Sequence, residues 1–119
     1  MIRDWKEYRG QINAAVKEIG TANPDLVKAY AAFHHANAAS KHLDAKTREL
    51  IALGVAVTLR CDGCINAHTE AAVRAGANKE EITDALGVAI MVNAGATMVY
   101  SAHVVDAFHT YATQNEVKP

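Results

Sequence analysis

Two cysteines and a histidine carry the spacing that thiol chemistry needs. The chain has only two cysteines, Cys61 and Cys64, arranged as Cys-x-x-Cys, and His68 follows Cys64 by four residues. Residues four apart share one face of a helix, so the His68 imidazole can take the proton of the Cys64 thiol. The thiolate is the reactive form, because a free thiol with a pKa of about 8.5 is mostly protonated at neutral pH. This pattern predicts a redox-active dithiol.

The two sulfurs are expected to have different surroundings. Cys61 lies at or just before the start of a helix, where backbone N–H groups favour a thiolate. Cys64 alone has a base at helical spacing, so we assign Cys64 as the proton-relayed thiolate and Cys61 as its disulfide partner, although either can attack first. Gly63 between them leaves space for a substrate disulfide or peroxide to approach.

Glu49 is the residue expected to complete the site. If the helix over residues 45–59 and the helix that carries the cysteines form an antiparallel pair turning at Arg60, Glu49 lies roughly 16 Å back from the turn, and His68 lies roughly 12 Å along the returning helix. The Glu49 carboxylate can then orient the His68 imidazole, directly or through a water, in a Glu49, His68, Cys64 relay.

The remaining pattern is helical throughout, because apolar residues recur at spacings of three and four and no strand pattern is present. Predicted stops are Gly20, Arg60 and Gly76, and predicted caps are Asn23 before Pro24, Asp44, and an Asn78 to Glu81 capping box. We expect an all-α domain of about six helices over residues 4–19, 24–38, 45–59, from the cysteine motif to 76, from 79 to a break near 93–95, and from there to about 111, with a frayed tail over 112–119.

Length and composition indicate one domain, residues 1–119, that associates with copies of itself. Half of the 119 residues are apolar, many of them alanine, which suits close helix packing and shared subunit surfaces. The formal charge of −1 without a basic block predicts no nucleic-acid or anionic-membrane partner. The N-terminus shows no export signal, so a cytoplasmic location is expected. The uncharged stretch Ala85–Ala102 is long enough to span a membrane, but its polar residues favour a buried helix junction at an oligomer interface.

These residues resemble a known family. Glu49, eleven residues, Cys61, two residues, Cys64, three residues and His68 look like the signature of the alkylhydroperoxidase D-like branch of the carboxymuconolactone decarboxylase family. The segments 70–77 and 81–86 are also similar to that family. The resemblance covers roughly residues 43–108.

The resemblance implies an all-helical fold that forms trimers or hexamers. It also implies a Cys-x-x-Cys pair that reduces peroxides, or that passes electrons from a lipoyl-type dithiol carrier to a peroxiredoxin partner, with no cofactor or resident metal. The family roles carry over to Glu49, Cys61, Cys64 and His68. The chain departs from the best-known members in being shorter than their two-lobed form and in having Gly63 where some have a second histidine. A lactone decarboxylase is disfavoured, since that branch generally lacks paired cysteines.

Other interpretations use the same side chains. Both cysteines, His68 and Glu49 can bind zinc tetrahedrally, which would make the chain a non-catalytic metal-binding or assembly module, although three of these four ligands would sit on regular helix. A slowly reacting stress-response thiol protein is a further alternative. The adjacent His34 and His35 are interpreted as surface or interface residues. His103 and Asp106 are interpreted as a structural pair, or as side chains that border the site from a neighbouring element.

Overall fold

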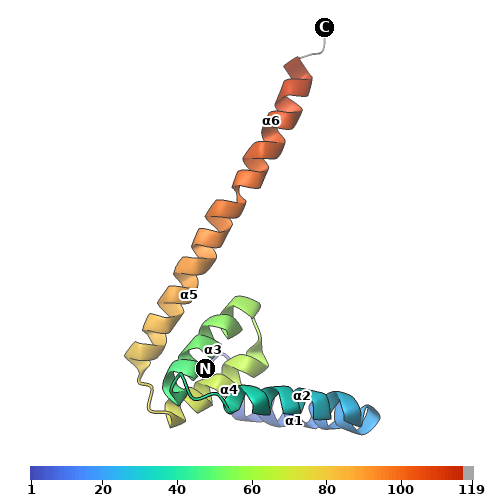
Figure 1. Cartoon of the computed structure of the whole chain (residues 1–119), viewed down its shortest axis with the longest axis vertical. Helices are drawn as coiled ribbons and strands as arrows, with labels where there is room; N and C mark the ends of the chain where they lie inside the picture. The colour runs from blue at the N-terminus through green and yellow to red at the C-terminus, as the bar shows by residue number, and fades with distance from the viewer. Residues whose placement is uncertain (117–119) are drawn as a thin grey trace.

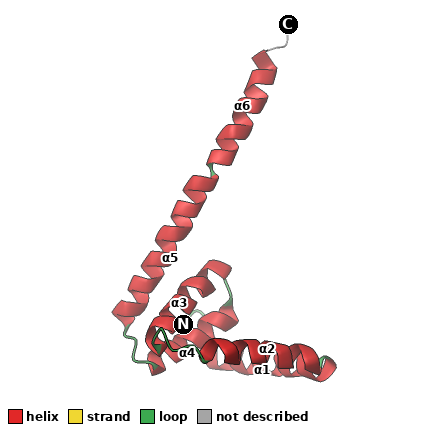
Figure 2. Cartoon of the chain, in the orientation of Figure 1, coloured by secondary structure: helices red, strands yellow, loops and turns green. Residues whose placement is uncertain are grey.

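The computed structural model describes residues 1–116, and this part of the chain consists of helices and short connections (Figure 2). The helices are α1 (Trp5–Ala22), α2 (Pro24–Ala38), α3 (Ala45–Leu59), α4 (Asp62–Arg74), α5 (Lys79–Tyr100) and α6 (Ala102–Glu116). The predicted all-α class, with six helices in one domain, is confirmed. Figure 1 shows α3 and α4 folded against each other, with the α1–α2 pair to one side and α5 and α6 in one long rod.

Helices α3 and α4 form the predicted antiparallel pair around a small core. Leu53, Ala56 and Ala72 are buried between or beside them, with exposed fractions of 3% or less. Arg60 ends α3 in the left-handed conformation, at φ 54° and ψ 43°, and its N–H donates to the carbonyls of Ala56 and Val57. Cys61 then caps the N-terminus of α4. The turn at Arg60 therefore reverses the chain directly before the cysteine motif.

The first helix continues past its predicted end at Gly20. It runs to Ala22, and Asn23 both closes it and caps α2, its side chain accepting from the Leu26 N–H. A Cβ at Gly20 would lie 3.4 Å from a methyl carbon of Val27. The glycine therefore sits inside α1 where α2 passes closest, and it gives α2 room rather than ending the helix.

Contacts between α1 and α4 hold the α1–α2 pair against the cysteine helix. The Asn66 side-chain amide donates to the Trp5 carbonyl at 2.6 Å, and Arg3 pairs with Asp62 at 3.1 Å. Arg9 and Glu70 form a second ion pair further along. These contacts fix the N-terminal helices relative to the cysteine motif.

The expected break near residues 93–95 is wrong, because α5 continues to Tyr100 and the interruption falls at Ser101. The Asn93 amide donates to the Ala89 carbonyl one turn earlier and to the Thr58 hydroxyl of α3, so the polar group is satisfied without unwinding the helix. The expected fraying from 112 is also wrong as far as Glu116, where α6 ends. Residues 117–119 of that predicted tail lie outside the described residues.

Beyond the Asn93–Thr58 contact, the rod formed by α5 and α6 projects from the rest of the molecule (Figure 1). The chain measures 67 × 41 × 35 Å, with a radius of gyration of 21.0 Å, against roughly 13 to 14 Å for a compact domain of this length. The helical stretch Lys79–Asn115 contains an 18-residue window with a mean hydropathy of 1.5, and by length and composition alone it is able to cross a membrane. Within one chain only 6% of the most apolar window of this stretch is buried, and the burial of Ala85–Ala102 at an oligomer interface stays a prediction.

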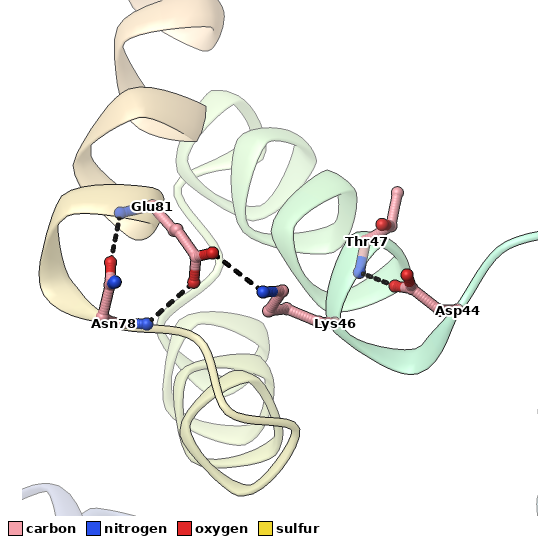
Figure 3. Close-up of polar contacts among 5 residues, drawn as sticks. All are labelled: Asp44, Lys46, Thr47, Asn78 and Glu81. Atoms are coloured by element: carbon pink, nitrogen blue, oxygen red, sulfur yellow. Dashed lines mark hydrogen bonds and ion pairs between the residues drawn. The ribbon is translucent and has the colours of Figure 1, made fainter.

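The N-termini of α3 and α5 are joined through charged caps (Figure 3). Asp44 accepts from the Thr47 N–H at 2.7 Å, and Asn78 and Glu81 form the predicted capping box. Lys46 donates to Glu81 at 2.8 Å. The Lys46 hydrogen bond lowers the pKa of the Glu81 carboxyl, the same bond raises the pKa of Lys46, and the backbone hydrogen bond from Thr47 lowers the pKa of Asp44.

Candidate functional site

The turn between α3 and α4 places both cysteines at the start of α4. Cys61 is the N-cap residue, and its Sγ accepts from the Cys64 backbone N–H at 3.2 Å. The two cysteines form a disulfide, with their Cα atoms 5.2 Å apart. A sulfur that accepts a backbone N–H at a helix N-terminus lies where a thiolate is favoured once the disulfide is reduced.

His68 and Glu49 meet across the α3–α4 pair as predicted. His68 Nδ1 and Glu49 Oε2 are 2.7 Å apart, so the contact is direct. Both side chains are partly buried, with exposed fractions of 32% for His68 and 24% for Glu49. A carboxylate accepts the Nδ1 proton, which leaves Nε2 of a neutral imidazole as the atom that can take a proton. Glu49 lies in the second turn of α3, which begins at Ala45.

Cys64 and His68 line a groove of about 510 Å³. Side chains of α2, of the loop that follows it, of α3 and of α4 line this groove, and most of the lining is apolar; its large apolar members are Tyr30, Phe33, Leu43, Ile51, Val55 and Leu59. Cys61 and Glu49 are not among the lining residues. Of the two cysteines, Cys64 is thus the one that borders the groove.

Sequence reasoning did not place α2 at the site. Arg48 fastens the end of α2 beside α3, because its Nη1 donates to the Ser40 carbonyl at 2.9 Å and its Nη2 donates to the Asn37 carbonyl. His34 of α2 also lines the groove, whereas its neighbour His35 does not. The sequence signal for this wall was an aromatic and a histidine side by side, Phe33 and His34, which by itself does not indicate which face of α2 is covered.

Asp62, between the two cysteines, is paired with a positive charge. Its carboxylate contacts the Arg3 guanidinium at 3.1 Å, and that guanidinium also lies over the ring of Tyr8, 4.4 Å from its centre. A free negative charge beside the sulfurs would disfavour a thiolate. The N-terminal segment therefore offsets the one acidic charge inside the motif.

The other predicted site residues lie elsewhere. His103 contacts the ring of Tyr100, with ring centres 4.4 Å apart, and no hydrogen bond joins it to Asp106 in the part of the chain that the structure describes. Within residues 1–116, no three histidine, cysteine or acidic side chains are grouped to hold a metal ion. In this structure Cys61 and Cys64 are joined in a disulfide, and His68 is hydrogen-bonded to Glu49.

Comparison with known proteins adds a family match. The model of the carboxymuconolactone decarboxylase family matches residues 24–107. A protein of Haemophilus influenzae, named only as uncharacterized, is 48% identical over 108 residues, which are 91% of this chain and 96% of that protein. A protein from the cox locus of Paracoccus denitrificans, also uncharacterized, is 35% identical over 75% of this chain and 80% of its own length.

Two solved structures share the fold. A crystal structure of a carboxymuconolactone decarboxylase family protein from Legionella pneumophila, in its apo form, has a TM-score of 0.70 and 29% identity, and the match covers 90% of this chain and 96% of that one. A protein from Methanobacterium thermoautotrophicum has a TM-score of 0.66 and 27% identity over 71% of this chain and 94% of its own.

Proposed function

The chain belongs to the carboxymuconolactone decarboxylase family, and we propose that it is a thiol-dependent oxidoreductase of the alkylhydroperoxidase D-like branch, reducing peroxides or disulfides with Cys64 and Cys61. The observation that carries this proposal is the Cys61–Cys64 disulfide beside the His68–Glu49 pair, at the mouth of an apolar groove. A decarboxylase would have no use for a cysteine pair that closes into a disulfide.

The four side chains have separate roles in the proposed cycle. In the reduced protein, His68 Nε2 takes the Cys64 proton while Glu49 holds the Nδ1 proton. The Cys64 thiolate attacks one oxygen of a peroxide, forms an S–O bond and expels the other oxygen with the bonding electron pair, which takes a proton and leaves as an alcohol. Cys61 then attacks the sulfur of the resulting sulfenic acid, and water leaves as the disulfide closes.

The electrons balance through an external dithiol. The peroxide gains two electrons and the cysteine pair loses two, so a dithiol donor must reduce the disulfide before the next turnover. We propose a lipoyl-type dithiol carrier as that donor, because the apolar groove can admit its carbon chain. Electrons then pass from this carrier through the cysteine pair to the peroxide, or to a peroxiredoxin partner. The cycle requires a reducing compartment, which supports a cytoplasmic location.

We also propose that the working form is a homo-oligomer, a trimer or hexamer. The exposed area of the chain is 9774 Å², against about 6,200 Å² for a compact monomer of this mass. The excess of about 3,600 Å² is larger than the roughly 1,000 to 2,500 Å² that one chain contributes to a single obligate interface, so it is enough for more than one interface per chain, as a trimer or hexamer has. Much of it comes from apolar side chains of the rod, more than half exposed, among them Ile90, Met91, Val99, Val104 and Phe108.

The test is a redox titration of the cysteine pair joined to a turnover assay. Purified protein is equilibrated in dithiothreitol buffers, alkylated and weighed by mass spectrometry, and the same protein is assayed with tert-butyl hydroperoxide and dihydrolipoamide. We expect a two-electron transition at a potential in the oxidoreductase range, about −120 to −270 mV, and peroxide turnover that is lost in Cys64→Ser with the helical content unchanged.

Two results would contradict the proposal. One is a wild-type protein that turns over neither peroxides nor disulfides with any dithiol donor. The other is stoichiometric zinc that resists dialysis, because it would favour the metal-binding alternative.

A further inference from the structure

Two ionisable side chains that line the groove, His34 and Tyr30, have no role in the cycle described above. The other ionisable groups of the lining are accounted for: Cys64 and His68 belong to the relay, and Arg48 is bonded to backbone carbonyls at the end of α2. Of the two that remain, His34 is the candidate for proton transfer, since an imidazole, unlike a phenol, exchanges its proton readily near neutral pH. Its imidazole makes no hydrogen bond to any other residue in the range 1–116, and its ring lies edge-on to that of Tyr30, with the ring centres 6.4 Å apart.

His34 reaches the groove from a different element than the relay does. Cys64 and His68 lie on α4, whereas His34 lies on α2. Arg48 of α3 holds the C-terminal end of α2 in place through its bond to the Ser40 carbonyl. A substrate that occupies the groove lies between Cys64 on one wall and His34 on the other. Both ring nitrogens of His34 are free to bond such a substrate.

The proposed reaction needs a second proton-transfer group in addition to His68. His68 takes the proton from Cys64, and its other nitrogen is occupied by Glu49 at 2.7 Å. When the bond in the substrate breaks, negative charge builds up on the departing atom, which lies away from the attacking sulfur. A positioned acid at that atom speeds such a step by typically 10²- to 10⁴-fold. An alkoxide needs this proton far more than an aromatic thiolate does.

We propose that His34 is the general acid that protonates the leaving group of the substrate bound in the groove, a role that rests on the proposed function. As Cys64 forms its bond to the near oxygen or sulfur, the far atom departs with the bonding electron pair and takes the proton of the His34 imidazolium. The proton that His68 received from Cys64 passes to solvent, and solvent reprotonates His34. No oxidant or reductant beyond the substrate and the cysteine pair is needed.

The experiment compares leaving groups in His34→Gln and His35→Gln. His35 is the matched control, since it is the same residue type on the same helix but does not line the groove. Each protein is reduced, freed of reductant and mixed with an excess of one oxidant, and the loss of thiols in a single turnover is timed. The oxidants are dithiobis(nitrobenzoate), hydroxyethyl disulfide and tert-butyl hydroperoxide, in order of increasing basicity of the leaving group.

The defect of His34→Gln should grow along this series. With dithiobis(nitrobenzoate), whose thiolate leaves readily without a proton, the rate should stay within about twofold of wild type, and with tert-butyl hydroperoxide it should fall by about tenfold or more. His35→Gln should match wild type with all three oxidants. Gln keeps a hydrogen-bonding side chain of similar size, so a wall that merely needs filling is preserved.

The results that would contradict the role of His34 differ from the result that would contradict the proposed function. An equal defect with every oxidant would show that His34 only shapes the groove, and rates equal to wild type would show that it does nothing in the reaction. Either result overturns the role of His34 and leaves the proposed function standing. Wild-type protein that reacts with none of the three oxidants would instead overturn the proposed function.

Discussion

At the scale of single residues, the two sulfurs of the motif are not equivalent. Cys61 caps α4 and accepts a backbone N–H, while Cys64 lines the groove four residues before His68. The cysteine that borders the groove is thus the one with a base at helical spacing. This arrangement supports Cys64 as the attacking thiolate and Cys61 as the residue that closes the disulfide.

The Glu49 and His68 pair should control how reactive the reduced Cys64 is. In His68→Ala the base is lost, and in Glu49→Gln the imidazole loses the carboxylate that holds its Nδ1 proton, so the thiolate fraction falls. We expect alkylation of Cys64 by iodoacetamide at neutral pH to slow by roughly three- to tenfold in each variant. Mass spectrometry of quenched samples measures the rate at each cysteine.

Glu80→Gln is the control for that measurement, because Glu80 is an exposed acid at the start of α5, away from the site. It should alkylate at the wild-type rate. If both site variants also alkylate at the wild-type rate, the relay has no influence on the thiol and Glu49 serves only to hold the α3–α4 pair together.

At the scale of elements, the caps determine where the site-bearing helices begin. Asp44 starts α3, Cys61 starts α4 and Asn78 starts α5, and in each case a side chain accepts from a free backbone N–H of the first turn. The Lys46–Glu81 bond then ties the start of α3 to the start of α5 (Figure 3). The caps and the Lys46–Glu81 bond together fix where these helices begin, and so they help to hold Glu49 opposite His68.

The Lys46–Glu81 bond should make stability depend on pH in a defined direction. The pKa of Glu81 is lowered in the folded protein, so its contribution is complete above the unfolded pKa of about 4.3 and is lost as pH falls through the folded pKa. The pKa of Lys46 is raised, so its contribution holds below about pH 10.4 and is lost at higher pH. Urea unfolding midpoints of wild type and Lys46→Met, measured from pH 3 to 9, check this.

Between these limits the wild-type midpoint should exceed that of Lys46→Met by a constant margin, and the margin should shrink below about pH 4. Lys79→Met is the comparison, since Lys79 is a lysine at the start of α5 that forms no ion pair among the described residues. A margin for Lys46→Met that stays unchanged down to pH 3 would contradict the assignment of the pH dependence to Glu81.

At the scale of the whole molecule, the main question is why the rod of α5 and α6 exposes so many apolar side chains. Its apolar side chains lie in contact with solvent along most of its length, while the buried core of the chain is small and made largely of alanine. A single copy with this much exposed apolar surface would aggregate or associate. The proposed association with further copies would cover the rod and supply the core that one chain lacks.

A charge on the rod should therefore break the assembly. We expect Val104→Asp and Phe108→Asp each to shift the mass measured by light scattering from a multiple of the chain mass towards one or two chains, because an unpaired carboxylate at a subunit interface costs several kcal/mol. Thr110→Asp, a polar exposed position of α6, is the control and should keep the wild-type mass. Wild-type protein that is monomeric in detergent-free buffer at micromolar concentration would rule out the proposed oligomer.

The sequence by itself determined the local features of this protein. Each of these features depends on residues within a few positions of each other: the spacing of Cys64 and His68, the caps at Asp44 and Asn78, and the turn at Arg60. Given that turn, helical geometry brings Glu49 level with His68. Helix ends were predicted less well where a polar or glycine residue was satisfied by contacts that the pattern does not reveal, as at Gly20 and Asn93.

Only the tertiary structure decided what surrounds the cysteines. That α2 forms a wall of the groove, with His34 and Phe33 in its lining, follows from Arg48 reaching the carbonyls of Asn37 and Ser40 and from α1 packing on α4. The projecting rod likewise depends on how few contacts α5 makes beyond α3. Such long-range contacts are set by the whole surface of each helix, whereas periodicity reports only which of its faces is apolar.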